Sequence, residues 1–124
     1  MTTVSLDALP GRPCPAAASL ELVGEKWSLL VVREIAMGST RFADIVTGTG
    51  APRDRIAARL KSLEAAGVVE RTPYQDSPVR FDYGLTEAGR DLLPILDALV
   101  AWGDRHAVAH DDPLRRPRTP FAAR

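Results

Sequence analysis

Two residue types that often build chemical centres are scarce in this sequence. Its 124 residues include one cysteine, Cys14, and two histidines. A single cysteine excludes an internal disulfide, and one cysteine with two histidines is too few for the usual ligand set of a structural zinc ion. We therefore expect neither a metal site nor a cofactor.

Long apolar stretches are also absent. No run of about 18 apolar residues occurs, so the sequence predicts no membrane-spanning helix. Residues 1–13 have neither the basic region nor the apolar block of a secretory signal. We expect a protein of the cytoplasm with no membrane partner.

Neither sign of charge is in excess, because 16 Lys and Arg side chains balance 16 Asp and Glu side chains. The distribution is uneven, however. Residues 41–61 contain five basic and two acidic side chains, whereas residues 87–104 contain one basic and four acidic ones. A local basic region attracts phosphates without making the whole protein bind nucleic acid indiscriminately. Residues 41–61 are therefore a candidate for nucleic-acid contact.

Glycine and proline divide the first half of the chain into predicted helices. The pattern predicts helices over residues 15–23 and 25–37, each followed by a glycine. Ser39 or Thr40 can cap a short third helix. The run TGTGA at 47–51 is typical of a turn, and it places the third helix next to a fourth.

The fourth helix is predicted from Pro52 to Gly67. Its inward stripe recurs at i, i+4 and i+7: Ile56, Leu60 and Leu63. The other side carries the polar side chains that a DNA groove would meet: Arg53, Asp54, Arg55, Arg59 and Ser62. Because arginine can bond both O6 and N7 of guanine, we expect Arg53 and Arg55 nearest the bases, and Arg59 at a base edge or a phosphate. A solvated helix face is the alternative.

Two strands and a last helix follow. Residues 68–74 and 79–85 are rich in strand-forming residues and flank a turn cluster, which predicts a hairpin. Thr86 can cap a long last helix that reaches about Arg105, and Pro94 should kink it.

This order of elements predicts a winged helix-turn-helix. The fold class is mainly α with a two-stranded β-wing (α+β), with helical dimerisation elements at both termini. We divide the chain into an N-terminal arm at 1–13 that can join a dimer interface, a winged helix-turn-helix domain with its dimerisation helix at 14–106, and a flexible tail at 107–124.

The hairpin tip carries a further candidate, Arg80. This arginine can enter a minor groove, where the negative potential favours it. Alternatively, it pairs with Asp82 or Glu70 and only stabilises the hairpin. Arg41, just before the third helix, is expected to hold a phosphate and so to position the protein on DNA.

The motifs resemble the HxlR family of bacterial winged-helix regulators, relatives of the MarR type. The resemblance covers residues 14–103. Its most specific parts are Cys-Pro followed by Gly-Glu-Lys-Trp at 24–27, the closure at 60–68 and the Tyr-Gly-Leu-Thr-Glu-Ala-Gly junction at 83–89. It implies a homodimer that binds DNA through the fourth helix and the wing and regulates neighbouring genes.

The last helix gives an independent reason to expect a homodimer. It carries two apolar stripes, and the predicted interface residues are Leu92, Leu93, Leu96, Leu99, Val100 and Trp102. One stripe can seal the core of its own domain, and the second needs a partner; a helix buried wholly in its own domain is the alternative. Two copies would place the reading helices about one DNA turn apart, roughly 34–36 Å, which predicts a pseudo-palindromic operator.

Two routes to a regulatory signal are open. Some members of the resembled family sense electrophiles or oxidants with a cysteine near the position of Cys14, and amide dipoles at a helix start favour a thiolate. The alternative is a small apolar residue buried at the dimer seam. A small-molecule effector is the second route, in a pocket lined by aromatic residues: Trp27, Phe42, Tyr83 and Trp102.

Enzyme activity is not expected. The TGTGA run lacks the further residues of a nucleotide-binding loop, and Cys14 has only the distant His106 as a conceivable base. We expect a sequence-specific, nucleoid-associated transcriptional regulator whose partners are double-stranded DNA, a second copy and an effector. The alternative is a winged-helix protein-interaction module, which would tolerate the loss of the arginines on the fourth helix.

Overall fold

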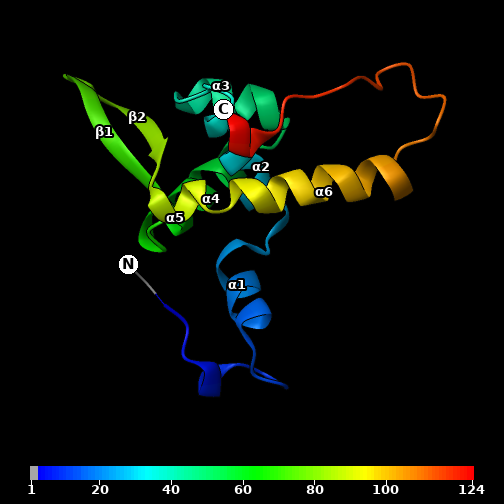
Figure 1. Ribbon diagram of the computed structural model, residues 1–124. Helices are drawn as coiled ribbons and strands as arrows, with labels where there is room; N and C mark the ends of the chain where they lie inside the picture. Colours follow the sequence, from blue (N-terminus) through cyan, green and yellow to red (C-terminus); the bar gives the residue numbers. More distant parts are fainter. Residues whose placement is uncertain (1–2) are drawn as a thin grey trace.

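The computed structural model describes residues 3–124, and the predicted fold class is confirmed (Figure 1). In chain order the elements are η1 (Leu6–Ala8), α1 (Pro15–Val23), α2 (Lys26–Ala36), α3 (Phe42–Thr49), α4 (Arg53–Ala65), β1 (Val69–Asp76), β2 (Val79–Leu85), α5 (Glu87–Arg90), α6 (Leu93–His106) and η2 (Phe121–Ala123). No helix among these described residues is long and apolar enough to cross a membrane.

The core forms around α2, which packs against α3, α4 and α6. Side chains from α2, α3, α4 and the first wing strand are fully buried, the largest being Ile45, Ile56, Leu63, Val31, Val32 and Val69. The inward stripe predicted for α4 is confirmed, because Ile56, Leu60 and Leu63 are all buried. Burying this stripe fixes which face of α4 remains exposed.

The turn between α3 and α4 is shorter than the sequence predicts. The predicted turn at 47–51 is largely helical, because α3 continues to Thr49 and ends at Gly50, whose φ of 72° is left-handed. The prediction that Ser39 or Thr40 caps α3 is also wrong. Arg41 is the N-cap without a side-chain bond, and the Thr40 hydroxyl instead donates to Asp82 on the wing.

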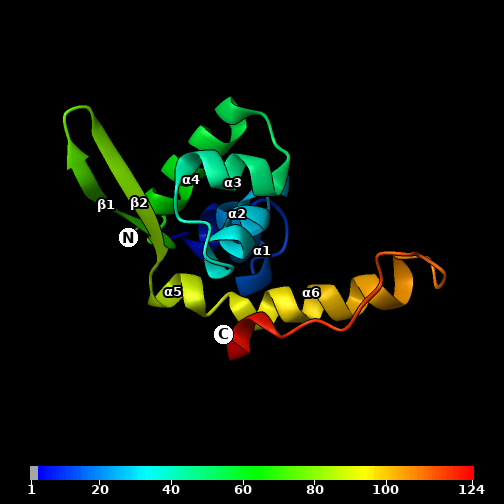
Figure 2. The same ribbon diagram turned by 90° about the horizontal axis from the view of Figure 1, so that it is seen from above.

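The wing is an antiparallel hairpin that projects away from the helices (Figure 1; Figure 2). Its register pairs Val69 with Leu85 at the base and Asp76 with Val79 at the tip, with an irregularity between Pro73 and Gln75. Only the base of β1 is buried. The tip is therefore available to an external partner.

The predicted single last helix is two helices. Thr86 caps α5 as predicted, since its hydroxyl accepts the amide of Gly89 at 3.1 Å. The chain then breaks at Asp91 and Leu92, before α6. Pro94 does not kink a continuous helix. It lies in the first turn of α6, where its missing N–H costs no helical hydrogen bond.

The flexible tail predicted at 107–124 does not describe the end of the chain. This segment turns after α6 and runs back along it to η2 (Figure 2). Phe121 is only 8% exposed and joins the hydrophobic core. One isolated aromatic residue leaves no periodic pattern in the sequence, which is why the docking was not predicted.

Candidate nucleic-acid interface

Three of the predicted DNA-contacting arginines meet around one hollow. It encloses about 360 Å³ between the start of α3, the start of α4 and the wing. Its walls include Arg41 from the α3 N-cap, Arg53 from α4 and Arg80 from β2. Positive charge from three separate segments thus converges at one place, as contacts to a polyanion require.

Arg41 is held in place by two wing residues. Its Nε lies 2.5 Å from Oδ1 of Asp82, and its guanidinium carbon lies 3.5 Å from the centre of the Tyr74 ring. The hydrogen bond that Arg41 donates to Asp82 raises the pKa of Arg41, so the group stays cationic. The Tyr83 amide also donates to the carbonyl of Thr40 at 2.8 Å. These contacts join the wing to the start of α3.

The Asp82 contact bears on the two interpretations of Arg80. Asp82 is occupied by Arg41 and Thr40, and within residues 3–124 Arg80 forms no ion pair with Asp82 or Glu70. Arg80 is exposed. The hairpin-stabilising role therefore has no support in the geometry, and the side chain remains available to a ligand.

The start of α4 presents an exposed polar face. Arg53, Asp54 and Arg55 are all exposed, and the Arg53 guanidinium lies 4.9 Å from the centre of the Phe42 ring. The N-cap, Pro52, makes no side-chain bond to the first amides of the helix. These donors, with the positive end of the helix dipole, suit a phosphate.

Arg59 forms an ion pair with a residue outside α4. Its Nε is 3.4 Å from Oε2 of Glu25, and its side chain is 27% exposed. The same Glu25 oxygen accepts the amide of Trp27 at 3.0 Å and so caps α2. Arg59 therefore joins α4 to the start of α2. Ser62 is exposed further along α4 and does not line the hollow.

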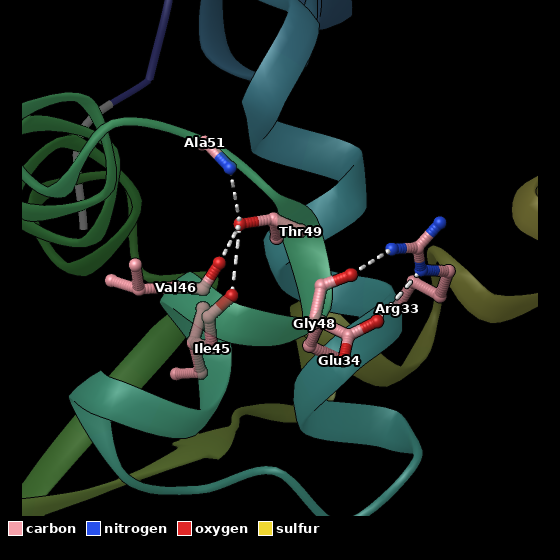
Figure 3. Close-up of polar contacts among 7 residues, drawn as sticks. All are labelled: Arg33, Glu34, Ile45, Val46, Gly48, Thr49 and Ala51. Atoms are coloured by element: carbon pink, nitrogen blue, oxygen red, sulfur yellow. Dashed lines mark hydrogen bonds and ion pairs between the residues drawn. The ribbon is translucent and has the colours of Figure 1, made fainter.

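A hydrogen bond from α2 holds the end of α3 in place (Figure 3). Arg33 donates from Nε to Glu34 at 2.9 Å and from Nη2 to the carbonyl of Gly48 at 3.0 Å. The Thr49 hydroxyl donates to the carbonyl of Ile45 at 2.8 Å and accepts the amide of Ala51 at 3.3 Å. These bonds fix the turn into α4.

Sequence reasoning missed Tyr74 and the Arg33–Glu34 pair as parts of this site, and it considered Asp82 only as a partner of Arg80. The Arg41–Asp82 contact spans 41 residues, and the Arg33–Gly48 contact spans 15. Both depend on how the elements pack. No local periodicity or spacing encodes them, so the sequence offered no signal for these residues.

The predicted dimer residues divide into two groups. Leu93 and Leu96 are buried in the core of this protomer, and Leu92 and Val100 pack against it. Three large apolar residues of α6 remain exposed: Ile95 at 50%, Leu99 at 49% and Trp102 at 62%. They are spaced at i, i+4 and i+7, so they share one helix face. We refer to these three residues as the α6 stripe.

Cys14 is the N-cap of α1. Its Sγ accepts the amide of Ala17 at 3.3 Å, and the residue is half-buried. This contact agrees with the helix start that the sequence predicted. It also directs the amide of Ala17 at the sulfur.

A cavity beside α6 differs from the predicted effector pocket. It encloses about 580 Å³ between the α1–α2 junction and α6. Its walls are mainly aliphatic, and none of Trp27, Phe42, Tyr83 or Trp102 lines it. Its single aromatic residue is Phe121, from the returning C-terminal segment. Two of the four expected residues, Phe42 and Tyr83, instead line the hollow between α3, α4 and the wing.

A helix pair closed by a short turn and followed by a β-hairpin defines a winged helix-turn-helix protein. The chain belongs to the HxlR-like helix-turn-helix family, whose model matches residues 22–111. It is similar to the HTH-type transcriptional regulator Rv3095 of Mycobacterium tuberculosis, with 42% identity over 102 residues. The match covers 82% of this chain and 60% of the relative, so the chain spans less than two thirds of that protein's length.

Solved structures give the same family resemblance. The crystal structure of PA1607 is similar with a TM-score of 0.74 and 33% identity, over 86% of this chain and 80% of that one. The redox regulator HypR in its oxidised form is similar with a TM-score of 0.69 and 30% identity, over 77% of this chain and all of HypR (100%). The relatives are thus described as regulators rather than as enzymes.

Proposed function

We propose that this chain is a sequence-specific DNA-binding transcriptional regulator that acts as a homodimer on a pseudo-palindromic operator. The observation that carries the proposal is the convergence of Arg41, Arg53 and Arg80 around one hollow beside the exposed start of α4. The face of α4 opposite its buried stripe presents Arg55 to solvent. An exposed α-helix of this kind fits a major groove.

Each arginine has a distinct role in this proposal. Arg55 and Arg53 read base edges in the major groove, where arginine favours guanine. Arg80 enters the adjacent minor groove. Arg41, fixed by Asp82 and Tyr74, meets a phosphate and sets the register without reading sequence. Arg59, bound to Glu25, supports the orientation of α4 and leaves the bases to the other two residues.

The homodimer is supported by the α6 stripe. Exposed apolar residues at helical spacing favour burial against another apolar surface. Leu20 on α1 adds a side chain that is 65% exposed near the same end of the fold, because it lines the α1–α6 cavity together with Leu99. An isologous interface through α6 would present two reading helices to successive half-sites.

A thiol-reactive signal is part of the proposal. HypR is described as a redox regulator, and Cys14 has its sulfur at a helix start. With one cysteine per chain, oxidation would give an adduct, a mixed disulfide with a small thiol, or a bridge between the Cys14 residues of two subunits. The aliphatic cavity beside α6 is the place for a small-molecule effector, if the signal is of that kind.

Two experiments test sequence-specific DNA binding. The first selects binding sites from a random double-stranded DNA library. The second measures the fluorescence anisotropy of the enriched sequence at two salt concentrations. We expect a palindromic consensus and an affinity for it well above that for scrambled competitor. Binding that is weak, unselective and erased by salt would favour the alternative, a winged-helix protein-interaction module. That alternative has no residue contact in its favour comparable to the three converging arginines.

A further inference from the structure

The returning C-terminal segment is attached to the fold at two points. Through its middle, Arg115 forms an ion pair with the end of α6, with Nη1 3.6 Å from Oδ1 of Asp104. Near its end, both carboxylate oxygens of Asp97 on α6 accept backbone amides, from Phe121 at 2.7 Å and Ala122 at 3.0 Å. We refer to residues 107–124 as the strap.

The buried anchor of the strap is Phe121. Its side chain is part of the same buried cluster as Val31 and Ile35 of α2 and Leu96 of α6. The strap therefore docks along α6, which carries the α6 stripe, and adds Phe121 to the core that α2 and α6 share (Figure 2). Burial of the Phe121 side chain contributes substantially to the stability of the docked strap, which is a short segment.

The strap also reaches the pair that holds α3. Phe121, Arg118 and Arg124 border a hollow of about 350 Å³ whose other walls include Arg33 and Glu34. Arg33 donates to Glu34 and to the carbonyl of Gly48 at the end of α3 (Figure 3). Phe121, which Asp97 holds through its backbone, and the Arg33–Glu34 pair, which bonds to the end of α3, thus lie around one hollow.

We propose that the strap positions the DNA-reading helices, with Asp97 and Phe121 as positioning residues and Arg33 as the connection to α3. This inference rests on the proposed function, because positioning is expressed as DNA affinity. The strap contributes no residue to the hollow between α3, α4 and the wing, so its effect on DNA is indirect. A change in strap docking would alter the end of α3 first and the wing least.

Amide hydrogen exchange with DNA anisotropy on the full chain tests this proposal. Phe121→Ala removes the anchor, and Phe121→Leu is the matched control that keeps an apolar side chain. We expect Phe121→Ala to raise exchange at residues 121–123 and 45–51 and to leave strand 69–76 unchanged. DNA affinity should fall roughly two- to tenfold. Phe121→Leu should stay close to wild type in all of these measurements.

Two further variants separate the steps. Asp97→Asn keeps the size of the side chain but only one of the two acceptor oxygens, so it should loosen residues 121–123. This milder variant still tests the proposal if Phe121→Ala does not fold. Arg33→Lys cannot hold Glu34 and Gly48 together as a guanidinium does. It should raise exchange at 45–51 while 121–123 stays protected. That order of effects places Arg33 between the strap and α3.

Three results would overturn the strap proposal: opening of 121–123 with no change at 45–51, equal loosening of the wing, or unchanged DNA affinity in a variant whose 45–51 segment is loosened. Failure of the proposed function looks different. In that case the wild-type protein shows no selective DNA binding, while the exchange measurements still decide whether the strap acts on α3.

Discussion

The carboxylate of Glu34 occupies the space in which any side chain on Gly48 would have to lie. A β-carbon built on Gly48 would be 1.7 Å from Oε1 of Glu34 and 2.4 Å from its Cδ. Glu34 is only 8% exposed, and Arg33 holds it by a 2.9 Å ion pair. Glycine is present inside α3 because α2 and α3 approach each other closely here, although glycine weakens a helix.

Gly48→Ala should therefore destabilise the protein. Alanine is the better helix former by about 1 kcal/mol, but the new methyl group displaces Glu34 and breaks its pairing with Arg33. We expect a net loss of about 1–3 kcal/mol in the free energy of unfolding, measured by urea denaturation. In a Glu34→Ala background the same substitution should cost much less, which a double-mutant cycle would show.

Gly103→Ala is the matched control for that experiment. Gly103 lies inside α6, and a β-carbon there would meet nothing within 4 Å. The helix propensity of alanine should then act alone and stabilise the protein by about 0.5–1 kcal/mol. If both substitutions stabilised the protein, the close approach of Glu34 to Gly48 would not constrain the fold.

Arg55→Ala should weaken binding to the selected DNA site by about 1–3 kcal/mol and relax the sequence preference at one position. Arg55 is exposed and lies outside the buried stripe of α4, so its loss should leave the unfolding free energy unchanged. Anisotropy with single-base variants of the site measures both effects. Arg105→Ala, at an exposed position near the end of α6, is the control and should bind normally. Unchanged affinity in Arg55→Ala would place the base contact elsewhere.

Arg41→Gln should act differently from Arg55→Ala. Because Arg41 is expected at a phosphate, its loss should weaken binding to the selected site and to scrambled DNA alike. The slope of log affinity against log salt should become shallower by about 1. Titration of both DNAs over a range of salt concentrations measures this. A selective loss on the specific site alone would mean that Arg41 reads bases or that its contact with Asp82 orients the wing.

The elements themselves could be predicted because their signals are local. The stripe Ile56, Leu60 and Leu63 fixed the inward face of α4, and glycine and proline marked the breaks between helices. The alternation in β2 and the turn residues before it indicated the wing. Each of these patterns involves residues only a few positions apart in the sequence. The packing of distant segments therefore did not change the elements that they predict.

The partners of the charged groups could not be predicted, because they depend on packing between distant segments. Arg59 and Arg55 have similar positions in the sequence pattern, yet the start of α2 brings Glu25 to Arg59, whose side chain is 27% exposed. Asp82 was considered a partner for Arg80 because the two are close in sequence. The start of α3 instead brings Arg41 to it. Phe121 likewise gave no local signal before it docked.

Cys14→Ser tests the thiol signal. If Cys14 is the sensor, a thiol oxidant such as diamide should release the wild-type protein from DNA, and a thiol reductant should restore binding. The serine variant should bind with unchanged affinity in both conditions, because the hydroxyl can still cap α1. Mass spectrometry of the oxidised protein distinguishes a small-thiol adduct from a disulfide between subunits. Equal oxidant responses in both proteins would exclude Cys14 as the sensor.

Leu99→Glu tests whether the α6 stripe is the dimer interface. Leu99 is the middle residue of the stripe and is half exposed, so a charge there should be tolerated by the monomer but not by a buried apolar interface. We expect sedimentation to show a monomer, with unchanged helix content. Affinity for the full palindrome should fall to that for a single half-site, because the two reading helices no longer bind together. Leu114→Glu is the matched control, since Leu114 is 67% exposed outside α6 and should leave the dimer intact. A Leu99→Glu protein that stays dimeric would move the interface away from this stripe.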